Sequence, residues 1–132
     1  MLIKGIIAAL AVAGITSLRA SDVDISKLPP VAAKKDVTYA KDIKPILEKS
    51  CFKCHGEEKQ KAKLRLDSID AIVKKGSENG PVVVVGKSEK SSLVHTAAGL
   101  IEDMQMPPEG KGDPLTKDQI GLIRAWIDQG AK

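Results

Sequence analysis

The stretch Cys51-Phe52-Lys53-Cys54-His55 carries most of the chemical information in this chain of 132 residues. Two thiols three positions apart on a helical turn lie on one face, where each can add to one of the two vinyl groups of a single porphyrin. The imidazole of His55 follows directly, so covalent attachment would hold it beneath the iron. The C-x-x-C-H pattern therefore predicts one covalently attached c-type haem, with His55 as an iron ligand.

The same residues have three other interpretations, which are a disulfide, a zinc site and a redox-active dithiol. An exported chain with two cysteines ordinarily suggests a disulfide. A structural zinc ion needs four nitrogen or sulfur donors, and beyond this motif only His95 is an obvious candidate. A thioredoxin-like dithiol lies at a strand-to-helix junction of a βαβ pattern, which the sequence lacks. Haem attachment explains the motif best.

A second axial ligand would have to come from further along the chain, where Met104, Met106 and His95 are the candidates. Met106 precedes Pro107-Pro108, and a proline restricts both its own φ and the residue before it. A stiff backbone lowers the entropic cost of placing a weakly binding thioether. Met106 is therefore the predicted sixth ligand, and His95 is expected to be a surface histidine.

The N-terminal segment has the pattern of a secretory signal peptide. Lys4 supplies a positive charge, residues 5–18 are uncharged and mostly apolar, and small residues mark a cleavage site after Ala20. A run of 14 residues is short of the ~20 needed to span a bilayer as a helix, so an uncleaved anchor is the weaker interpretation. The predicted location is periplasmic or otherwise exported, without stable membrane insertion after cleavage.

Composition limits the function further. Loss of Lys4 and Arg19 with the signal leaves 19 basic and 17 acidic residues, a net charge of +2. This charge is too small to indicate nucleic-acid binding. The sequence contains no G-x-S-x-G, H-E-x-x-H or phosphate-binding glycine motif, so no enzyme activity is predicted.

The remaining sequence predicts a short lead-in and about four short helices. Residues 21–36 contain Pro29-Pro30 and have no apolar period, which indicates a flexible lead-in before a domain at residues 37–132. Helices are expected at residues 39–50, restarted at Pro45, and at residues 69–75, with Ser68 as the cap. A third helix is expected to start at a Ser88 cap and end at Gly99. Residues 82–85 should be extended, residues 101–114 a loop, and Thr116 should cap the last helix.

Only three aromatic residues are present, and Trp126 lies on the apolar stripe of the last helix. Aromatic rings normally supply much of the buried area of a core, so a bound cofactor would provide the missing apolar volume. Five lysines surround the motif, at positions 49, 53, 59, 61 and 63. They are either a solvated face or a docking surface.

Taken together, these residues resemble a single-haem cytochrome c, and more closely the planctomycete-type cytochrome c domain. The resemblance runs from about Val37 to the C-terminus. Besides the C-x-x-C-H-G motif it rests on the following stretches: Ile43-Lys44-Pro45-Ile46-Leu47, Leu64-Arg65-Leu66-Asp67-Ser68, Gly80-Pro81, Val85-Gly86-Lys87, Ser91-Ser92-Leu93, Met106-Pro107-Pro108 and residues 120–131.

The resemblance implies an all-α cytochrome c fold in which the first and last helices cross. It further implies that Cys51 and Cys54 hold the haem, that His55 and Met106 ligate the iron, and that the activity is electron transfer with a redox partner protein. Two other functions stay open, which are a haem enzyme or sensor with an open sixth site and a haem-bearing interaction module of a larger complex.

Overall fold

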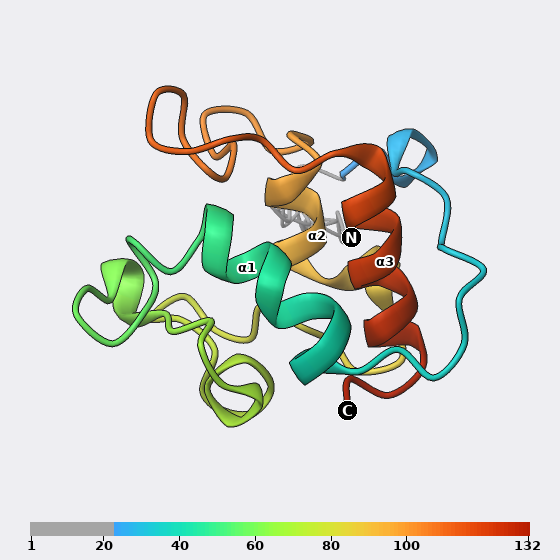
Figure 1. Cartoon of the computed structure of the whole chain (residues 1–132). Coiled ribbons are helices and arrows are strands. Elements are labelled where there is room, and N and C mark those ends of the chain that lie inside the picture. The colour runs from blue at the N-terminus through green and yellow to red at the C-terminus, as the bar shows by residue number, and fades with distance from the viewer. Residues whose placement is uncertain (1–22) are drawn as a thin grey trace, which may run out of the picture.

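The computed structural model describes residues 23–132 and is helical, with no strand in that range. Three α-helices, α1 (Lys44–Ser50), α2 (Ser92–Ala97) and α3 (Lys117–Asp128), surround the core (Figure 1). Short 3-10 or π-helical turns complete the fold: η1 (Ile25–Lys27), η2 (Tyr39–Ile43), η3 (Lys61–Lys63), η4 (Ala71–Lys75) and η5 (Ser88–Lys90). The all-α prediction is confirmed.

The first predicted helix is present, and it changes from a π-helical turn to an α-helix just before Pro45. Thr38 is the N-cap of η2, and its side chain accepts a hydrogen bond from the Lys41 amide. It continues directly into α1, where Pro45 lies in the first turn. Proline is tolerated there because that amide has no helical partner. The helix ends at Ser50 and delivers the chain to Cys51.

Helix α3 is the clearest element, and it packs against η2. Thr116 and Gln119 form the predicted capping box, and the apolar stripe of the helix is buried. Trp126 is fully buried, with its ring centroid 6.0 Å from that of Tyr39. Its indole N–H donates to the Lys132 carbonyl at 3.0 Å. The first and last helices therefore meet through these two rings, as the family resemblance implies.

The middle of the chain follows the predictions except at Ser88. The Ser68 hydroxyl accepts from the Ala71 amide at 3.1 Å, and η4 ends at Gly76, which has φ +62°. Only Val82 and Val83 of the extended valine run are buried. Ser88 does not cap α2.

The hydroxyl of Ser88 is instead tied to the last helix. It donates to Asp128 at 3.0 Å and accepts from the Arg124 Nε at 3.1 Å, and α2 starts only at Ser92. The predicted cap is therefore wrong, because a buried hydroxyl bonds to the partners that the fold brings to it.

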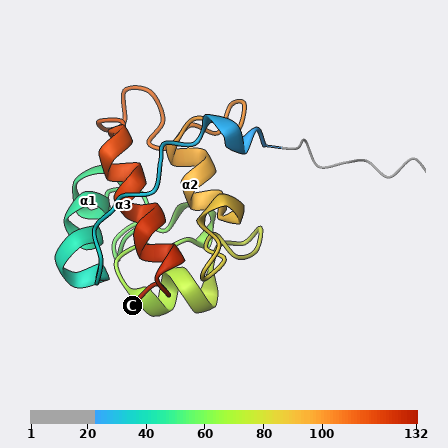
Figure 2. The same cartoon turned by 90° about the vertical axis from the view of Figure 1, so that its right-hand side faces the viewer.

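The segment that the sequence predicts as a flexible lead-in lies along α3 (Figure 2). The Ala32 amide donates to the Gly121 carbonyl at 3.0 Å, and Arg124 Nη1 donates to the Pro29 carbonyl at 2.6 Å. Gln129 Nε2 donates to the Lys34 carbonyl at 2.8 Å. These contacts make residues 29–34 a packed strap in this structure. The domain boundary at residue 37 stays a prediction.

Gly121 is the point at which the strap comes nearest to α3. A Cβ at this position would lie 2.5 Å from the Pro30 carbonyl oxygen, closer than such atoms approach. We expect Gly121→Ala to displace the strap, although alanine favours a helix by about 1 kcal/mol over glycine. Amide hydrogen exchange at Ala32 should become faster than in the unmodified protein. Gly112→Ala, where a Cβ meets its nearest neighbour at 3.4 Å, is the control; equal Ala32 protection in both variants would contradict the close approach.

The predicted signal peptide, residues 1–20, lies outside the described residues. Within residues 23–132, none of the helices has the length and apolar character needed to cross a membrane.

Candidate functional site

A cavity of about 400 Å³ opens between the end of α1, helix α2 and the loop at residues 101–114. Its volume falls in the range of small-molecule and cofactor sites. Buried apolar side chains form its walls: Leu47, Leu64, Leu66, Leu93, Leu115 and Ile123. Both cysteines, His55, Met104 and Met106 also line it. The fold therefore brings all the sulfur and imidazole donors predicted by the sequence, except His95, to one apolar space.

The cysteine motif forms one tight turn directly after α1. The amides of Cys54 and His55 both donate to the Cys51 carbonyl, at 3.2 and 2.9 Å. Gly56 ends the turn against the Phe52 carbonyl oxygen, which would lie only 2.5 Å from a Cβ. Glycine is needed at this position because any side chain would press on that backbone atom. Both cysteines of this turn line the cavity.

Cys51 and Cys54 are free thiols, and both are half-buried. Burial, and then the neighbouring charge of Cys54, raises the pKa of the Cys51 thiol to about 11. A thiol with so high a pKa carries little thiolate at neutral pH. This property does not suit Cys51 as the attacking sulfur of a dithiol exchange site, which needs a lowered pKa.

The His55 ring is fixed by a backbone carbonyl. Its Nδ1 lies 3.0 Å from the Lys61 carbonyl oxygen, which only an N–H can approach as a donor. The ring therefore carries its proton on Nδ1, and the lone pair of Nε2 is free. In this tautomer Nε2 can bind a metal ion. Burial lowers the pKa of His55 below its ordinary value, which favours the neutral ring.

The sequence does not reveal that the Lys61 carbonyl orients His55, because every residue has a carbonyl group. This carbonyl belongs to the η3 turn, where Ala62 and Lys63 have φ +55°. It also accepts a hydrogen bond from the Leu64 amide, at 3.1 Å. No side-chain pattern signals such a contact.

The two candidate methionines differ in exposure. Met106 is half-buried, whereas Met104 is 47% exposed. The Met106 amide donates to the Thr96 carbonyl of α2 at 3.1 Å, and buried Pro107 follows through a cis peptide bond. The loop has no helix, as predicted. Its contact with α2 fixes the backbone at Met106 and therefore favours this sulfur over that of Met104.

His95 is not the surface histidine that the sequence predicts. It is only 9% exposed, and its Nε2 lies 2.7 Å from the Glu89 carbonyl oxygen. It does not line the cavity. Within the described residues, no group of three or more His, Cys, Asp or Glu side chains is placed to hold a metal ion.

Comparison with known proteins supports the haem interpretation of this cavity. A family model described as planctomycete cytochrome C matches residues 51–110, which include the cysteine motif, η3, η4, α2 and both methionines. Residues 51–110 are similar to a planctomycete-type cytochrome c domain. Searches of curated proteins and of solved structures gave no match. The expected resemblance is confirmed, and haem binding and electron transfer are the functions that this cytochrome c domain indicates.

The residues of the cavity fit a c-type haem. The walls are mostly apolar, both cysteines line the cavity, and the His55 nitrogen that can bind a metal ion is the one that the Lys61 carbonyl leaves free. Met106, which carries a thioether, lines the same cavity. Which of these side chains ligate the iron stays a prediction.

Proposed function

We propose that the protein is a single-haem electron carrier, with the haem attached through Cys51 and Cys54 and the iron ligated by His55 and Met106. The observation that carries the proposal is the cavity in which all four side chains meet. A bound c-type haem would supply one-electron Fe(II)/Fe(III) chemistry. The domain match supports haem binding in general, and the cavity supports this ligand set in particular.

The side chains have separate tasks in this proposal. Cys51 and Cys54 hold the cofactor so that it cannot dissociate. His55, oriented through Nδ1 by the Lys61 carbonyl, is a more basic ligand than an unpaired imidazole, which favours the oxidised state. The Met106 thioether favours the reduced state, and the leucine walls exclude water. The balance of these effects sets the reduction potential.

We also propose that the protein is exported and acts in the periplasm with a redox partner protein. The sequence of residues 1–20 supports export, and covalent haem attachment outside the cytoplasm in bacteria agrees with it.

A visible absorption spectrum of protein produced together with the haem-attachment machinery tests the function. A carrier should show six-coordinate, low-spin iron in both oxidation states. A high-spin fraction that binds cyanide, carbon monoxide or peroxide readily would indicate an enzyme or sensor with an open sixth site, and would contradict the proposal.

The sixth ligand can be tested by comparing two methionine variants. We expect Met106→Ala to lower the reduction potential, to remove the far-red sulfur-to-iron charge-transfer band of the oxidised form, and to open the iron to added ligands. A thioether ligand favours Fe(II), so its loss lowers the reduction potential. Met104→Ala is the matched control, and it should keep the band and the potential. The assignment is wrong if Met104→Ala loses the band while Met106→Ala keeps it.

A further inference from the structure

Helix α2 is short, and the segment that carries Met106 supplies part of its C-terminal cap. The last four carbonyl groups of a helix have no partner within the helix. In α2 these are the carbonyls of residues 94–97. The first two accept the amides of Ala98 and Leu100, which follow the helix, at 2.9 and 3.0 Å. The last two accept hydrogen bonds from the loop at residues 101–114.

Two consecutive residues of this loop make the contacts. The Met106 amide donates to the Thr96 carbonyl at 3.1 Å, beside the Gly99 amide, which donates to the same oxygen at 3.2 Å. The Gln105 side chain folds back over the end of α2, and its Nε2 donates to the Ala97 carbonyl in a long hydrogen bond of 3.5 Å. Its Oε1 lies over Gly99, where an added Cβ would collide with it. Gln105 therefore touches α2 through both polar atoms of its amide group.

The end of α2 that these contacts reach is a wall of the cavity. Leu93, Thr96 and Ala97 of α2 line the cavity, and so do Met104 and Met106 of the loop. The hydrogen bonds to the Thr96 and Ala97 carbonyls therefore hold the Met106 backbone against this wall.

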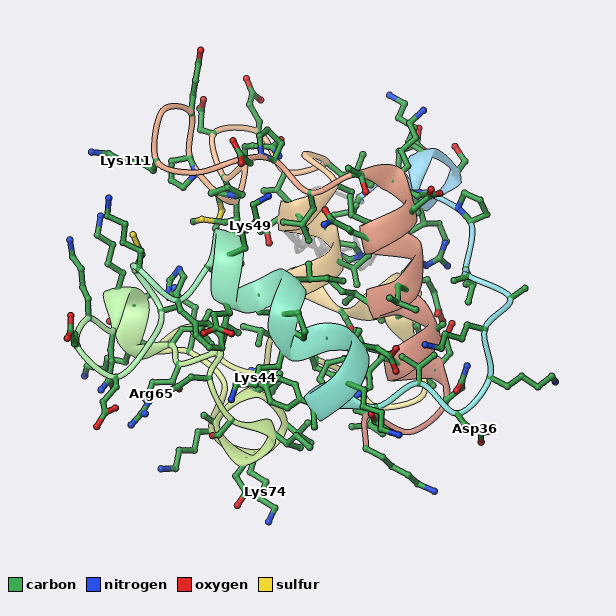
Figure 3. The ribbon with its side chains drawn as sticks, in the orientation of Figure 1. Asp36, Lys44, Lys49, Arg65, Lys74 and Lys111 are labelled. Atoms are coloured by element: carbon green, nitrogen blue, oxygen red, sulfur yellow. The ribbon has the colours of Figure 1, made fainter. Side chains whose placement is uncertain are left out.

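The loop has a second attachment, at the end of α1. Pro107 is buried, and a Cβ at Gly112 would lie 3.4 Å from its ring and 3.5 Å from the Ser50 carbonyl oxygen. Figure 3 shows this part of the loop, marked by Lys111, above the end of α1, marked by Lys49. The methionine segment is thus held from both helices.

We propose that Gln105 is a positioning residue for the sixth iron ligand, because it holds the segment on the end of α2 so that the Met106 sulfur is presented to the iron. The proposal rests on the function proposed above. A held backbone lowers the entropic cost of forming a weak iron–thioether bond. The Met104 amide, in contrast, donates to the Ile101 carbonyl within the loop, at 3.2 Å, and this contact ties it to neither helix.

Imidazole, a neutral ligand that competes with the thioether for the oxidised iron, tests how firmly Met106 is held. Gln105→Ala should raise the imidazole affinity of the oxidised holoprotein about two- to fivefold, the lower part of the range for one hydrogen bond, because this bond is long and Gln105 is exposed. Gln105→Lys should keep the affinity of the unmodified protein, because a lysine can donate to the last carbonyls of a helix. Glu102→Ala is the control, since it shortens an exposed side chain of the same loop that does not line the cavity.

Gly99→Ala tests the same contact from the side of α2. The new Cβ should push the Gln105 amide away, so the imidazole affinity should rise as it does in Gln105→Ala. Gly99 has φ +70°, and alanine is strained at such an angle. Gly86→Ala is the matched control for strain: its φ is +81°, and within the described residues no atom outside the adjacent residues lies within 4 Å of the new Cβ. It should leave the affinity unchanged, and adding Gln105→Ala to Gly99→Ala should change it little further.

Amide hydrogen exchange of the holoprotein provides a readout that needs no added ligand. The Met106 amide should exchange faster in Gln105→Ala and in Gly99→Ala than in the unmodified protein. The Ala32 amide, which bonds to α3 from the strap, should keep its protection. A general loss of stability would accelerate exchange at both positions.

Two results would overturn the proposal. One is Gln105→Ala with the same imidazole affinity and the same Met106 exchange as Glu102→Ala. The other is an effect of Gly99→Ala that adds in full to that of Gln105→Ala, which would show that backbone strain alone causes it. Failure of the proposed function would be seen separately, because the unmodified oxidised protein would then lack the far-red sulfur-to-iron band.

Discussion

Replacing both cysteines, as Cys51→Ala with Cys54→Ala, should leave little folded protein. Without a bound haem, the apolar walls of the cavity of about 400 Å³ are left in contact with water, and the stabilisation that a ligand gives to the folded state is lost. A small domain has little stability to spare for such a loss. Of the three aromatic residues only Tyr39 and Trp126 are buried, so the core has little other bulk with which to close the space. Far-ultraviolet circular dichroism and thermal unfolding would measure the effect.

Lys53→Ala is the matched control for this variant, because Lys53 lies between the two cysteines and its side chain is exposed. It should retain the haem and the unfolding transition of the unmodified protein. A double cysteine variant with native helix content and a cooperative transition without haem would show that the fold does not depend on the cofactor.

Trp126→Ala should lower the free energy of unfolding by ~3–5 kcal/mol, the range for a fully buried large aromatic side chain. The ring is fully buried, contacts Tyr39, and donates its N–H to the Lys132 carbonyl. Its removal opens a cavity where η2 meets α3 and releases the C-terminus. Chemical denaturation of the haem-loaded protein would measure the loss.

Trp126→Phe provides the control, because it keeps most of the ring volume while losing the N–H donor. It should cost clearly less than the alanine variant. A loss below ~1 kcal/mol for Trp126→Ala would be inconsistent with a buried ring at this crossing.

Local sequence patterns predicted the elements that short-range interactions determine. The capping box at Thr116, the restart at Pro45 and the Ser68 cap each depend on residues within one helical turn. The C-x-x-C-H motif predicted a shared site for its three donors, which lie within five residues of the chain and line one cavity in the structure. The shortage of aromatic residues predicted a bound cofactor, and the structure has an apolar cavity with room for one.

Contacts between distant parts of the chain were the ones that the sequence could not reveal. Ser88 and Asp128 are 40 positions apart, and Arg124 meets the Pro29 carbonyl 95 positions away. A serine before an apolar stripe is typical of a helix cap, so the local pattern gave the wrong role for Ser88. The surface position predicted for His95 was wrong for another reason: its hydrogen-bond partner, the Glu89 carbonyl, is only six positions away but belongs to the backbone. Backbone groups such as the Lys61 carbonyl leave no trace in the side-chain pattern.

The intact mass of the denatured protein, followed by peptide mapping, tests whether this cavity holds a covalent haem. Protein made with the haem-attachment machinery should carry the mass of one haem through denaturation, and the peptide that contains Cys51 and Cys54 should retain it. A bare chain with both thiols free, or with a disulfide between them, would contradict the account.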